Sequence, residues 1–209
     1  MKLNTNKNSY IIIYSIIIVV IVAFLLAFVS QALKPMQEAN VALDVKKQIL
    51  NALNIRGLSN SQTEAKYKEV VVDEQTVDDE IVYTCNVEGE TKYVFHVKGM
   101  GLWGPIYGYI SVNEDKNTVY GSYFTHDSET AGLGAEIKDS RTWQEKFQGK
   151  KLFKDGVDGI ALGVKKKVQD AEVEVDAITG ATLTSDGVDR MLKDTKSGLG
   201  KYVEFLSGK

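Results

Sequence analysis

Cysteine and histidine are almost missing from this 209-residue chain, which contains one Cys and two His. A single thiol cannot form an internal disulfide, and Cys85 alone cannot hold a zinc ion or an iron–sulfur cluster. His96 and His126 are too few for a histidine-bound metal, so we expect no metal site. Any redox chemistry is therefore expected to come from a bound organic cofactor.

Proline is equally scarce, and basic residues are not in excess. Only two Pro occur in the chain, which argues against a disordered or low-complexity protein. The net charge of −3 gives no basic footprint for nucleic acid, so we expect no nucleic-acid partner. The length fits one ordinary domain together with an anchor.

Charge is absent from residues 10–29, a run rich in Ile, Val, Leu and Phe. About twenty such residues, wound as a helix, match the hydrocarbon core of a bilayer. A cleaved signal peptide is the alternative, but its apolar core is typically only about 7–15 residues long. The length therefore favours a retained anchor in membrane lipid. The run contains no ionisable side chain of the kind that lines ion pathways, so it is not a pore on its own.

The charges that flank this run indicate its orientation. Lys2 and Lys7, with no acidic residue before the run, favour a cytoplasmic N-terminus. The bias is small, because basic residues also follow the run at Lys34, Lys46 and Lys47. We predict an anchor over residues 1–32 in the cell inner membrane, and a domain over residues 33–209 on the periplasmic side.

The remaining sequence predicts an α+β fold, in which helices pack on antiparallel hairpins. Alternating apolar residues predict one hairpin that turns at residues 88–90, and a second with strands over 106–112 and 118–124. Helical spacing and further alternation predict the other elements. These are helices over 36–54 and 62–70, a short helix from Asp139 or Ser140 to Phe147, a strand over 171–177, and a closing helix over 185–206 with candidate breaks at Gly198 and Gly200.

Several reactive or aromatic side chains have ordinary structural interpretations. Cys85 falls on the apolar side of its strand, which predicts a buried and inert thiol. His96 is expected to be half-exposed on a strand, and Trp143 to lie in the core. His126 has no neighbouring acid or nucleophile in its loop, so we predict no catalytic residue there or elsewhere. Residues 165–167, three lysines, are expected to form a solvated surface.

Residues 176–185, DAITGATLTS, form the unusual segment, because hydroxyl groups flank two very small residues between a predicted strand and a predicted helix. Thr184 or Ser185 is expected to cap that helix. Its free N–H groups and the positive end of its dipole would then face the loop. A phosphate at Thr182 would lie in that field. A plain strand–turn–helix connection explains the same residues, and nothing in them by itself specifies a flavin.

The pattern Asp176-x-x-Thr179-Gly180-Ala181-Thr182-x-Thr184 resembles the attachment motif of the FMN-binding domain family. The resemblance implies that Thr182 carries FMN through a phosphoester bond, which a flavin transferase installs. Asp176 would belong to the signature that the transferase reads, and it is also a candidate to accept a backbone N–H in the turn. The other expected contacts in this stretch are Thr179, Gly180, Ala181, Leu183, Thr184 and Ser185.

Two further stretches resemble those of the C subunits of sodium-translocating NADH:quinone reductases. They are GLWGPIYG at residues 101–108 and ETAGLGAE at residues 129–136, in which Ala131 replaces the usual Pro and makes the loop less rigid. The second stretch lacks the third Gly and the βαβ unit of a dinucleotide site, so we predict no NAD site there. The resemblance instead implies flavin contacts from Glu129, Thr130, Gly132, Leu133 and Gly134. Trp103 is either a packing anchor or a residue beside the flavin.

The resemblance implies an electron relay rather than a free-standing enzyme. The covalent FMN would pass electrons inside the Na(+)-translocating NADH:quinone oxidoreductase, while partner membrane subunits oxidise NADH, reduce quinone and move sodium. Two alternatives stay open. One is the homologous G subunit of the Rnf complex, although Trp103-Gly104-Pro105 favours the sodium-translocating reductase. The other is an anchored binding or scaffold domain without a cofactor.

Overall fold

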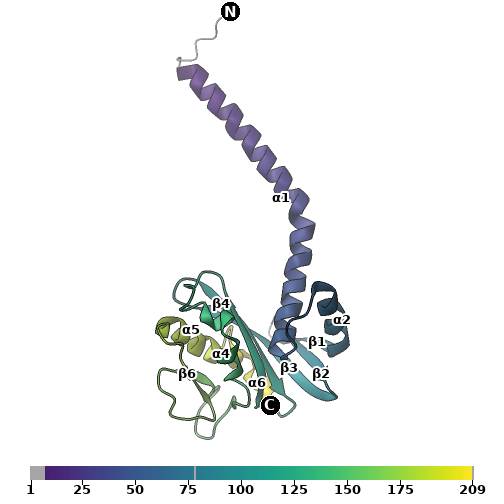
Figure 1. Cartoon of the computed structure of the whole chain (residues 1–209), viewed down its shortest axis with the longest axis vertical. Coiled ribbons are helices and arrows are strands. Elements are labelled where there is room, and N and C mark those ends of the chain that lie inside the picture. The colour runs from purple at the N-terminus through teal and green to yellow at the C-terminus, as the bar shows by residue number, and fades with distance from the viewer. Residues whose placement is uncertain (1–7, 78, 209) are drawn as a thin grey trace, which may run out of the picture. The chain divides into compact units, whose positions relative to one another are not determined.

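A computed structural model describes residues 8–77 and 79–208. By its internal contacts the chain divides between Asp44 and Val45 into two compact units. The first unit consists of the greater part of helix α1 (Asn8–Ala52), which is drawn in purple and blue in Figure 1. The second unit contains the end of α1 and all the other elements.

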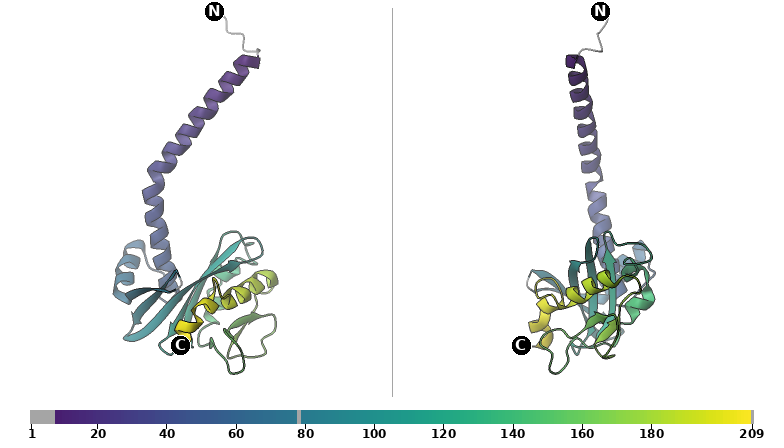
Figure 2. Two further views of the ribbon diagram at one scale, coloured as in Figure 1. Left: turned by 180° about the vertical axis from the view of Figure 1, so that it is seen from behind. Right: turned by 90° about the vertical axis from the view of Figure 1, so that its left-hand side faces the viewer.

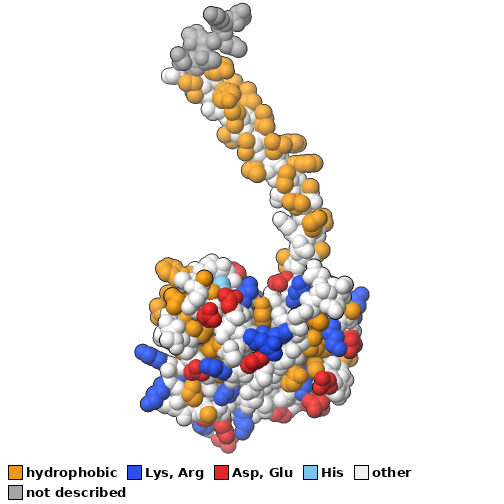
Figure 3. Space-filling view, in the orientation of Figure 1, with side chains coloured by type: hydrophobic (Ala, Val, Ile, Leu, Met, Phe, Trp, Pro, Cys, Tyr) orange, Lys and Arg blue, Asp and Glu red, His pale blue; other side chains and the backbone are white. Residues whose placement is uncertain are grey.

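Helix α1 is long and apolar enough to cross a membrane, with a mean hydropathy of 3.3 over its most apolar window. Hydrophobic side chains cover its N-terminal part in Figure 3. The helix predicted over residues 36–54 is confirmed as far as Ala52, but it is not a separate helix, because α1 continues through Pro35 without a break. A proline inside a helix removes one backbone hydrogen bond, and the good helix formers on both sides of Pro35 outweigh that loss. Figure 1 shows that α1 bends part-way along its length.

A five-stranded antiparallel sheet forms the centre of the second unit. Its strands lie in sequence order and are β1 (Val71–Val77), β2 (Glu80–Val87), β3 (Glu90–Met100), β4 (Pro105–Asn113) and β5 (Val119–His126). Both predicted hairpins are confirmed. The first turns through Glu88 and Gly89, both with positive φ, so that Val87 pairs with Glu90. This two-residue turn suits the twist of the strands.

Strand β1 was not predicted, because its sequence shows no alternation of buried and exposed residues. Its central five residues are all exposed, and it pairs only with β2 at the edge of the sheet. The helix before it, α2 (Asn60–Val70), confirms the prediction for residues 62–70. Ile81, an apolar residue of β2, is exposed next to this edge strand.

The sheet buries both of its faces. On one face, Tyr83 and Cys85 pack against the end of α1 and against α2. On the other face, Val82 and Phe95 pack against the C-terminal helices. Figure 2 shows α2 and the yellow-green helix α5 on opposite sides of the strands. Consecutive residues of a strand point to opposite faces of the sheet, so neighbouring apolar residues such as Val82 and Tyr83 are both buried, each in a different core.

The C-terminal half covers the second face with short elements. They are α3 (Glu136–Asp139), α4 (Arg141–Glu145), β6 (Gly163–Lys165), β7 (Glu174–Asp176), α5 (Thr182–Lys193), η1 (Leu199–Tyr202) and α6 (Val203–Ser207). Ser140 caps α4 as predicted, and Trp143 is buried against Phe124 and Phe147 as expected. Strand β6 was not predicted. It pairs in parallel with β7, which is shorter than the predicted strand.

The predicted closing helix over 185–206 starts earlier than expected and is divided into α5, η1 and α6, the last of which ends at Ser207. Helix α5 begins at Thr182 and ends at Lys193, so the interruption starts before Gly198, the candidate break that it includes. The Asp194 carboxylate accepts hydrogen bonds from the backbone N–H groups of Lys196 at 2.7 Å and Ser197 at 2.8 Å. An Asp that bonds to the backbone two and three residues ahead favours a turn over further helix.

Candidate functional site

The three stretches that resemble the family, residues 101–108, 129–136 and 176–185, meet at one end of the sheet. Because neighbouring strands are antiparallel, the turn between β3 and β4 and the end of β5 leave the sheet at the same end, where Ile106 pairs with His126. Helix α5 packs against β3, and its Gly187 lies close against the backbone of Met100 and Gly101. The topology therefore brings residues 101–104, 129–135 and 178–184 together.

A pocket of about 210 Å³ opens between these three segments. It is lined by Leu102, by Glu129, Thr130, Leu133 and Gly134, and by residues 180–184. All of these were expected contacts except Leu102, which the sequence marked only by its place between Gly101 and Trp103. Figure 3 shows hydrophobic side chains on the part of the domain where Figure 1 labels α5.

Glu129 joins the three segments. Its carboxylate accepts hydrogen bonds from the Trp103 backbone N–H at 2.8 Å and from the Thr184 hydroxyl at 2.5 Å. The side chain is only 7% exposed. Burial alone would raise the pKa of Glu129, but these bonds and those from the backbone N–H groups of Leu102 and Gly104 hold it below its usual range. Glu129 is therefore ionised at neutral pH.

Two motif glycines make room for this carboxylate. A Cβ atom at Gly101 would lie 2.5 Å from Oε1 of Glu129, and one at Gly134 would overlap Oε2 of Glu129 and the Thr184 hydroxyl. Any larger residue would push the acid away from its donors. The glycines of the two stretches thus serve the packing of Glu129. His126 Nδ1 accepts the Glu129 backbone N–H at 3.2 Å and orders the same loop.

Helix α5 begins without a side-chain cap. Ala181 is its N-cap residue and provides no hydrogen bond from its side chain. The predicted cap at Thr184 or Ser185 is wrong, since the Thr184 hydroxyl donates to Glu129 and the Ser185 hydroxyl accepts the Ile178 backbone N–H at 3.1 Å. Both side chains are buried and serve tertiary contacts. The first turn of α5, whose residues Thr182, Leu183 and Thr184 line the pocket, therefore has no side-chain cap for its N–H groups.

Thr182 is the first residue of α5, and its side chain is exposed. Gly180, with φ of +79°, turns the chain into the helix, and a Cβ there would lie 2.9 Å from Leu133. The hydroxyl group of Thr182 is thus presented on a helix end rather than in the loop in which it was expected. Gly132, also at positive φ, lies in open space at the turn of the opposite loop.

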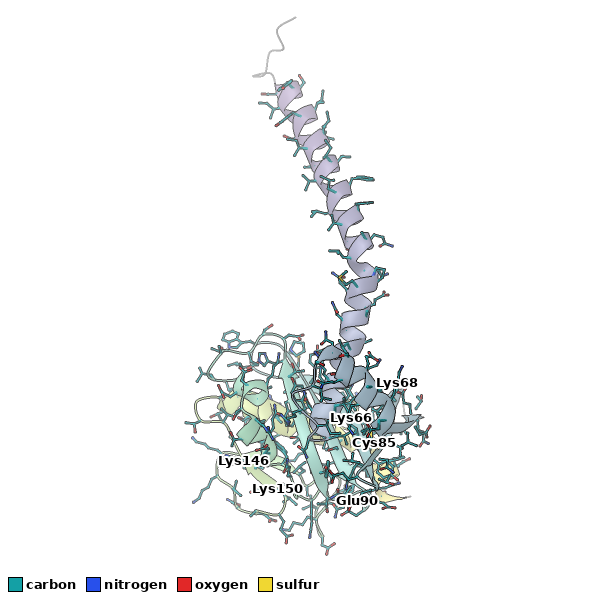
Figure 4. The ribbon with its side chains drawn as sticks, turned by 45° about the vertical axis from the view of Figure 1, so that its right-hand side comes forward. Lys66, Lys68, Cys85, Glu90, Lys146 and Lys150 are labelled. Atoms are coloured by element: carbon teal, nitrogen blue, oxygen red, sulfur yellow. The ribbon has the colours of Figure 1, made fainter. Side chains whose placement is uncertain are left out.

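Asp176 and Thr179 lie in a second cleft, of about 270 Å³, next to the first. The Asp176 carboxylate pairs with Lys146 Nζ at 2.7 Å, and its backbone carbonyl accepts the Trp143 indole N–H at 2.8 Å. Figure 4 shows Lys146 and Lys150 on a different part of the domain from Lys66 and Lys68 of α2. Lys146 was not singled out in the sequence, because thirty residues separate it from its partner.

Apolar side chains are unusually exposed around the first pocket. Leu102, Leu133 and Leu183 line it, and each is more than 40% exposed. Trp103 is 67% exposed, so its interpretation as a packing anchor is wrong. Trp103 lies in a tight turn that is closed by a hydrogen bond of 2.9 Å from the Gly101 backbone N–H to the Gly104 carbonyl. This turn leaves the indole ring in solvent. Such a group of exposed apolar residues indicates a binding site.

Comparison with known proteins identifies the family. Residues 101–196 match the FMN-binding domain family. The crystal structure of the C subunit of Na(+)-translocating NADH-quinone reductase from Parabacteroides distasonis superposes with a TM-score of 0.76 and 37% identity, over 85% of this chain and 98% of that chain. The chain belongs to the family of these C subunits. The α+β fold predicted from the sequence is thereby confirmed.

Further members show how much of the family the chain represents. The C subunit of the Haemophilus ducreyi reductase is 40% identical over 148 residues, which are 69% of this chain and 53% of that protein. The protein of Pasteurella multocida is 42% identical over 61% of this chain and 50% of its own length. The chain thus spans about half the length of these relatives. NqrC of Shewanella oneidensis, at 22% identity and a TM-score of 0.64, shares the fold.

The pocket suits the ligand that the family match supports, which is FMN. A flavin nucleotide combines an anionic phosphate with a flat and largely apolar ring. The uncapped start of α5 offers N–H groups for the phosphate, and Leu102, Leu133 and Leu183 offer apolar contact for the ring. The apolar α1 helix, in turn, fits the single-pass membrane anchor of a membrane-complex subunit.

Proposed function

We propose that this chain is the electron-relay subunit of a Na(+)-translocating NADH:quinone reductase, with FMN joined to Thr182 by a phosphoester bond. One observation carries the proposal. Within the region that matches the FMN-binding domain, the exposed Thr182 hydroxyl lies on the first turn of an uncapped helix and lines the apolar pocket. No other exposed hydroxyl among the lining residues occupies a helix start.

The start of α5 supports a phosphate chemically. The Thr182 hydroxyl oxygen would become the bridging oxygen of the ester and lose its proton. The anionic phosphate would then lie near the free N–H groups and the positive end of the helix dipole, an interaction worth about 0.3–1 kcal/mol. No acidic residue occupies the first turn of α5 itself.

The pocket walls support the ring. The flavin would supply the redox chemistry, and the chain's residues would hold it in place and limit its contact with water. Leu102, Leu133 and Leu183 provide apolar surface, and the exposed Trp103 extends that surface beyond the pocket. We assign no catalytic acid or base to this chain, because electron relay requires none.

The proposed setting is a membrane complex. Residues 1–32 would anchor the chain in the cell inner membrane, and residues 33–209 would lie on the periplasmic side. Other membrane subunits would oxidise NADH, reduce quinone and move sodium, and a flavin transferase would load the domain during maturation. Covalent attachment would prevent loss of the cofactor outside the cytoplasm.

Intact mass tests the attachment. The full chain, produced together with a flavin transferase and then denatured, should carry the mass of one FMN less one water. Thr182→Ala should abolish this mass completely. Thr142→Ala is the matched control, because Thr142 is also exposed in the first turn of a helix, but Ser140 caps that helix. It should retain the flavin.

Two results would contradict the attachment. A wild-type chain without bound flavin, made beside a transferase that labels another substrate, would refute the covalent cofactor. A flavin retained by Thr182→Ala would place the attachment at another residue.

A reporter fused to the C-terminus tests the orientation. An alkaline phosphatase fusion should be active, since that enzyme folds only outside the cytoplasm, and a cytoplasmic β-galactosidase fusion should be inactive. The reverse pattern would contradict the periplasmic placement of the domain.

A further inference from the structure

Glu129 stands out among the acidic residues of the chain. Of all Asp and Glu side chains in the described residues, it alone is buried. It is also the only carboxylate that lines the pocket containing Thr182. A buried charge is costly unless something compensates it, so its presence beside a proposed redox cofactor requires an explanation.

No cation balances this charge within residues 8–77 and 79–208, because none of the ion pairs found there includes Glu129. Its compensation comes from neutral donors, namely the Thr184 hydroxyl and the backbone N–H groups of Leu102, Trp103 and Gly104. Hydrogen bonds stabilise an ionised carboxylate but leave its net charge of −1 in place. The pocket therefore contains a fixed negative charge.

The same hydrogen bonds give Glu129 a positioning role. Its two carboxylate oxygens accept hydrogen bonds from the Trp103 backbone and the Thr184 side chain, which belong to two of the three segments around the pocket. The neighbours of those residues, Leu102 and Leu183, are apolar lining residues. Glu129 thus ties these two segments together and keeps its own charge at a constant place beside them.

We infer that Glu129 makes the bound flavin harder to reduce, through its buried negative charge and its hold on these two segments. The inference rests on the proposed function, since it requires FMN in this pocket. Reduction adds electrons to the ring, and a nearby negative charge opposes that addition. At an effective dielectric constant of about 20, a unit charge about 10 Å away changes such an equilibrium by more than tenfold.

Potentiometric titration of the flavin-loaded full chain tests the inference. Glu129→Gln removes the charge and keeps the shape, and its amide oxygen can still accept from the backbone donors. We expect the reduction equilibrium to move at least tenfold toward the reduced flavin, which is about 30 mV for a two-electron couple. Asp127→Asn is the matched control, because it removes an exposed charge from the same loop. Water screens that charge, so its potential should match that of the wild type.

Three results would overturn the inference. The first is a Glu129→Gln protein that carries flavin at the wild-type potential. The second is an equal shift in Asp127→Asn. If Glu129→Gln fails to fold, Thr184→Val serves instead, since it removes one compensating donor and keeps the charge. The reduction potential of the Thr184→Val protein should fall below that of the wild type. An unchanged or higher potential is the third result that would overturn the inference. Absence of flavin from the wild-type chain would refute the proposed function as well, whereas these three outcomes leave that function intact.

Discussion

Helices α2 and α5 have almost the same length, 11 and 12 residues, but they begin in opposite ways. In α2, the Ser59 hydroxyl accepts the Gln62 backbone N–H, and the Gln62 side chain accepts the Ser59 backbone N–H. This is a complete capping box. In α5, the N-cap residue is Ala181, which cannot provide such a bond. A glycine at positive φ lies shortly before each helix, so the approach of the chain is similar in the two cases.

The difference separates the side of the sheet on which we propose a ligand from the opposite side. On the α2 side, the chain satisfies its own helix end and buries an apolar cluster beneath it, and the cleft beside Gly57 and Leu58 is smaller, at about 120 Å³. On the α5 side, the helix start has no side-chain cap and borders a pocket with exposed leucines. The nearby hydroxyls of Thr184 and Ser185 bond to Glu129 and to the Ile178 backbone instead. An uncapped helix end costs about 1 kcal/mol relative to a capped one, and a bound phosphate would recover that loss.

Cysteine labelling gives the largest expected contrast between the two sides. Cys85 lies in the apolar cluster of the α2 side, 1% exposed, and burial together with Glu74 raises its pKa to about 12. The reactive thiolate is therefore scarce even at pH 9. We expect no alkylation of the folded full chain by iodoacetamide at pH 7 or pH 9, and complete alkylation in urea, both read by intact mass.

A cysteine on the open side is the matched comparison. Leu183→Cys places a thiol at a position that is 57% exposed, and the folded protein should gain one label within minutes. Rapid labelling of Cys85 in the folded wild-type chain would show that the α2 side also opens, which would remove the contrast.

The two turn glycines give the next largest effect. An L residue in the left-handed region costs roughly 1–2 kcal/mol, so Gly57→Ala and Gly180→Ala should destabilise the chain by similar amounts in urea unfolding. A Cβ atom added at Gly57 would have no neighbour within 4 Å, whereas a Cβ atom added at Gly180 would press on Leu133. Only Gly180→Ala should therefore lower flavin loading, by several-fold on intact mass. Equal loading in the two variants would mean that the position of Leu133 does not matter to the pocket.

Removal of the α2 cap has a smaller effect. Ser59→Ala breaks the capping box and should lower the free energy of unfolding by about 1 kcal/mol, with no change in flavin loading. Ser61→Ala, an exposed neighbour in the first turn, should change stability by less than about 0.5 kcal/mol. If Ser59→Ala reduced loading as strongly as it reduced stability, the two helix ends would not be independent.

The strongly periodic parts of the fold could be predicted from the sequence. Alternation located both hairpins, and Ser140 located the start of α4, because these signals come from neighbouring residues. Strand β1 escaped prediction because an exposed edge strand has no buried face to impose a period of two. Strand β6 spans only three residues, which is too few for any period to be visible.

Most of the residues that line the pocket could be predicted from the sequence, but their geometry could not. The resemblance named the three stretches, and the antiparallel order of β3, β4 and β5 explains why they meet. The start of α5 was misplaced because Ser and Thr are preferred helix N-caps, which pointed to Thr184 or Ser185. In the structure, the hydroxyls of these two residues bond to Glu129 and to the Ile178 backbone instead. No local pattern shows that Glu129 is buried, since its donors lie 26 and 55 residues away.

The ion pair between Lys146 and Asp176 should have the smallest effect. Both side chains are about half exposed, and such pairs contribute about 0.2–1 kcal/mol. Lys146→Ala should therefore lower stability by that amount at low salt, and by almost nothing near 1 M salt, where charges are screened within about 3 Å. Arg141→Ala, which breaks the exposed pair with Glu145, should behave alike in urea unfolding. The buried Trp143 still holds the Asp176 carbonyl, so the turn before α5 should keep its shape and the chain should load flavin normally. A loss of loading in Lys146→Ala at unchanged stability would show that the second cleft, and not only the open end of α5, takes part in maturation.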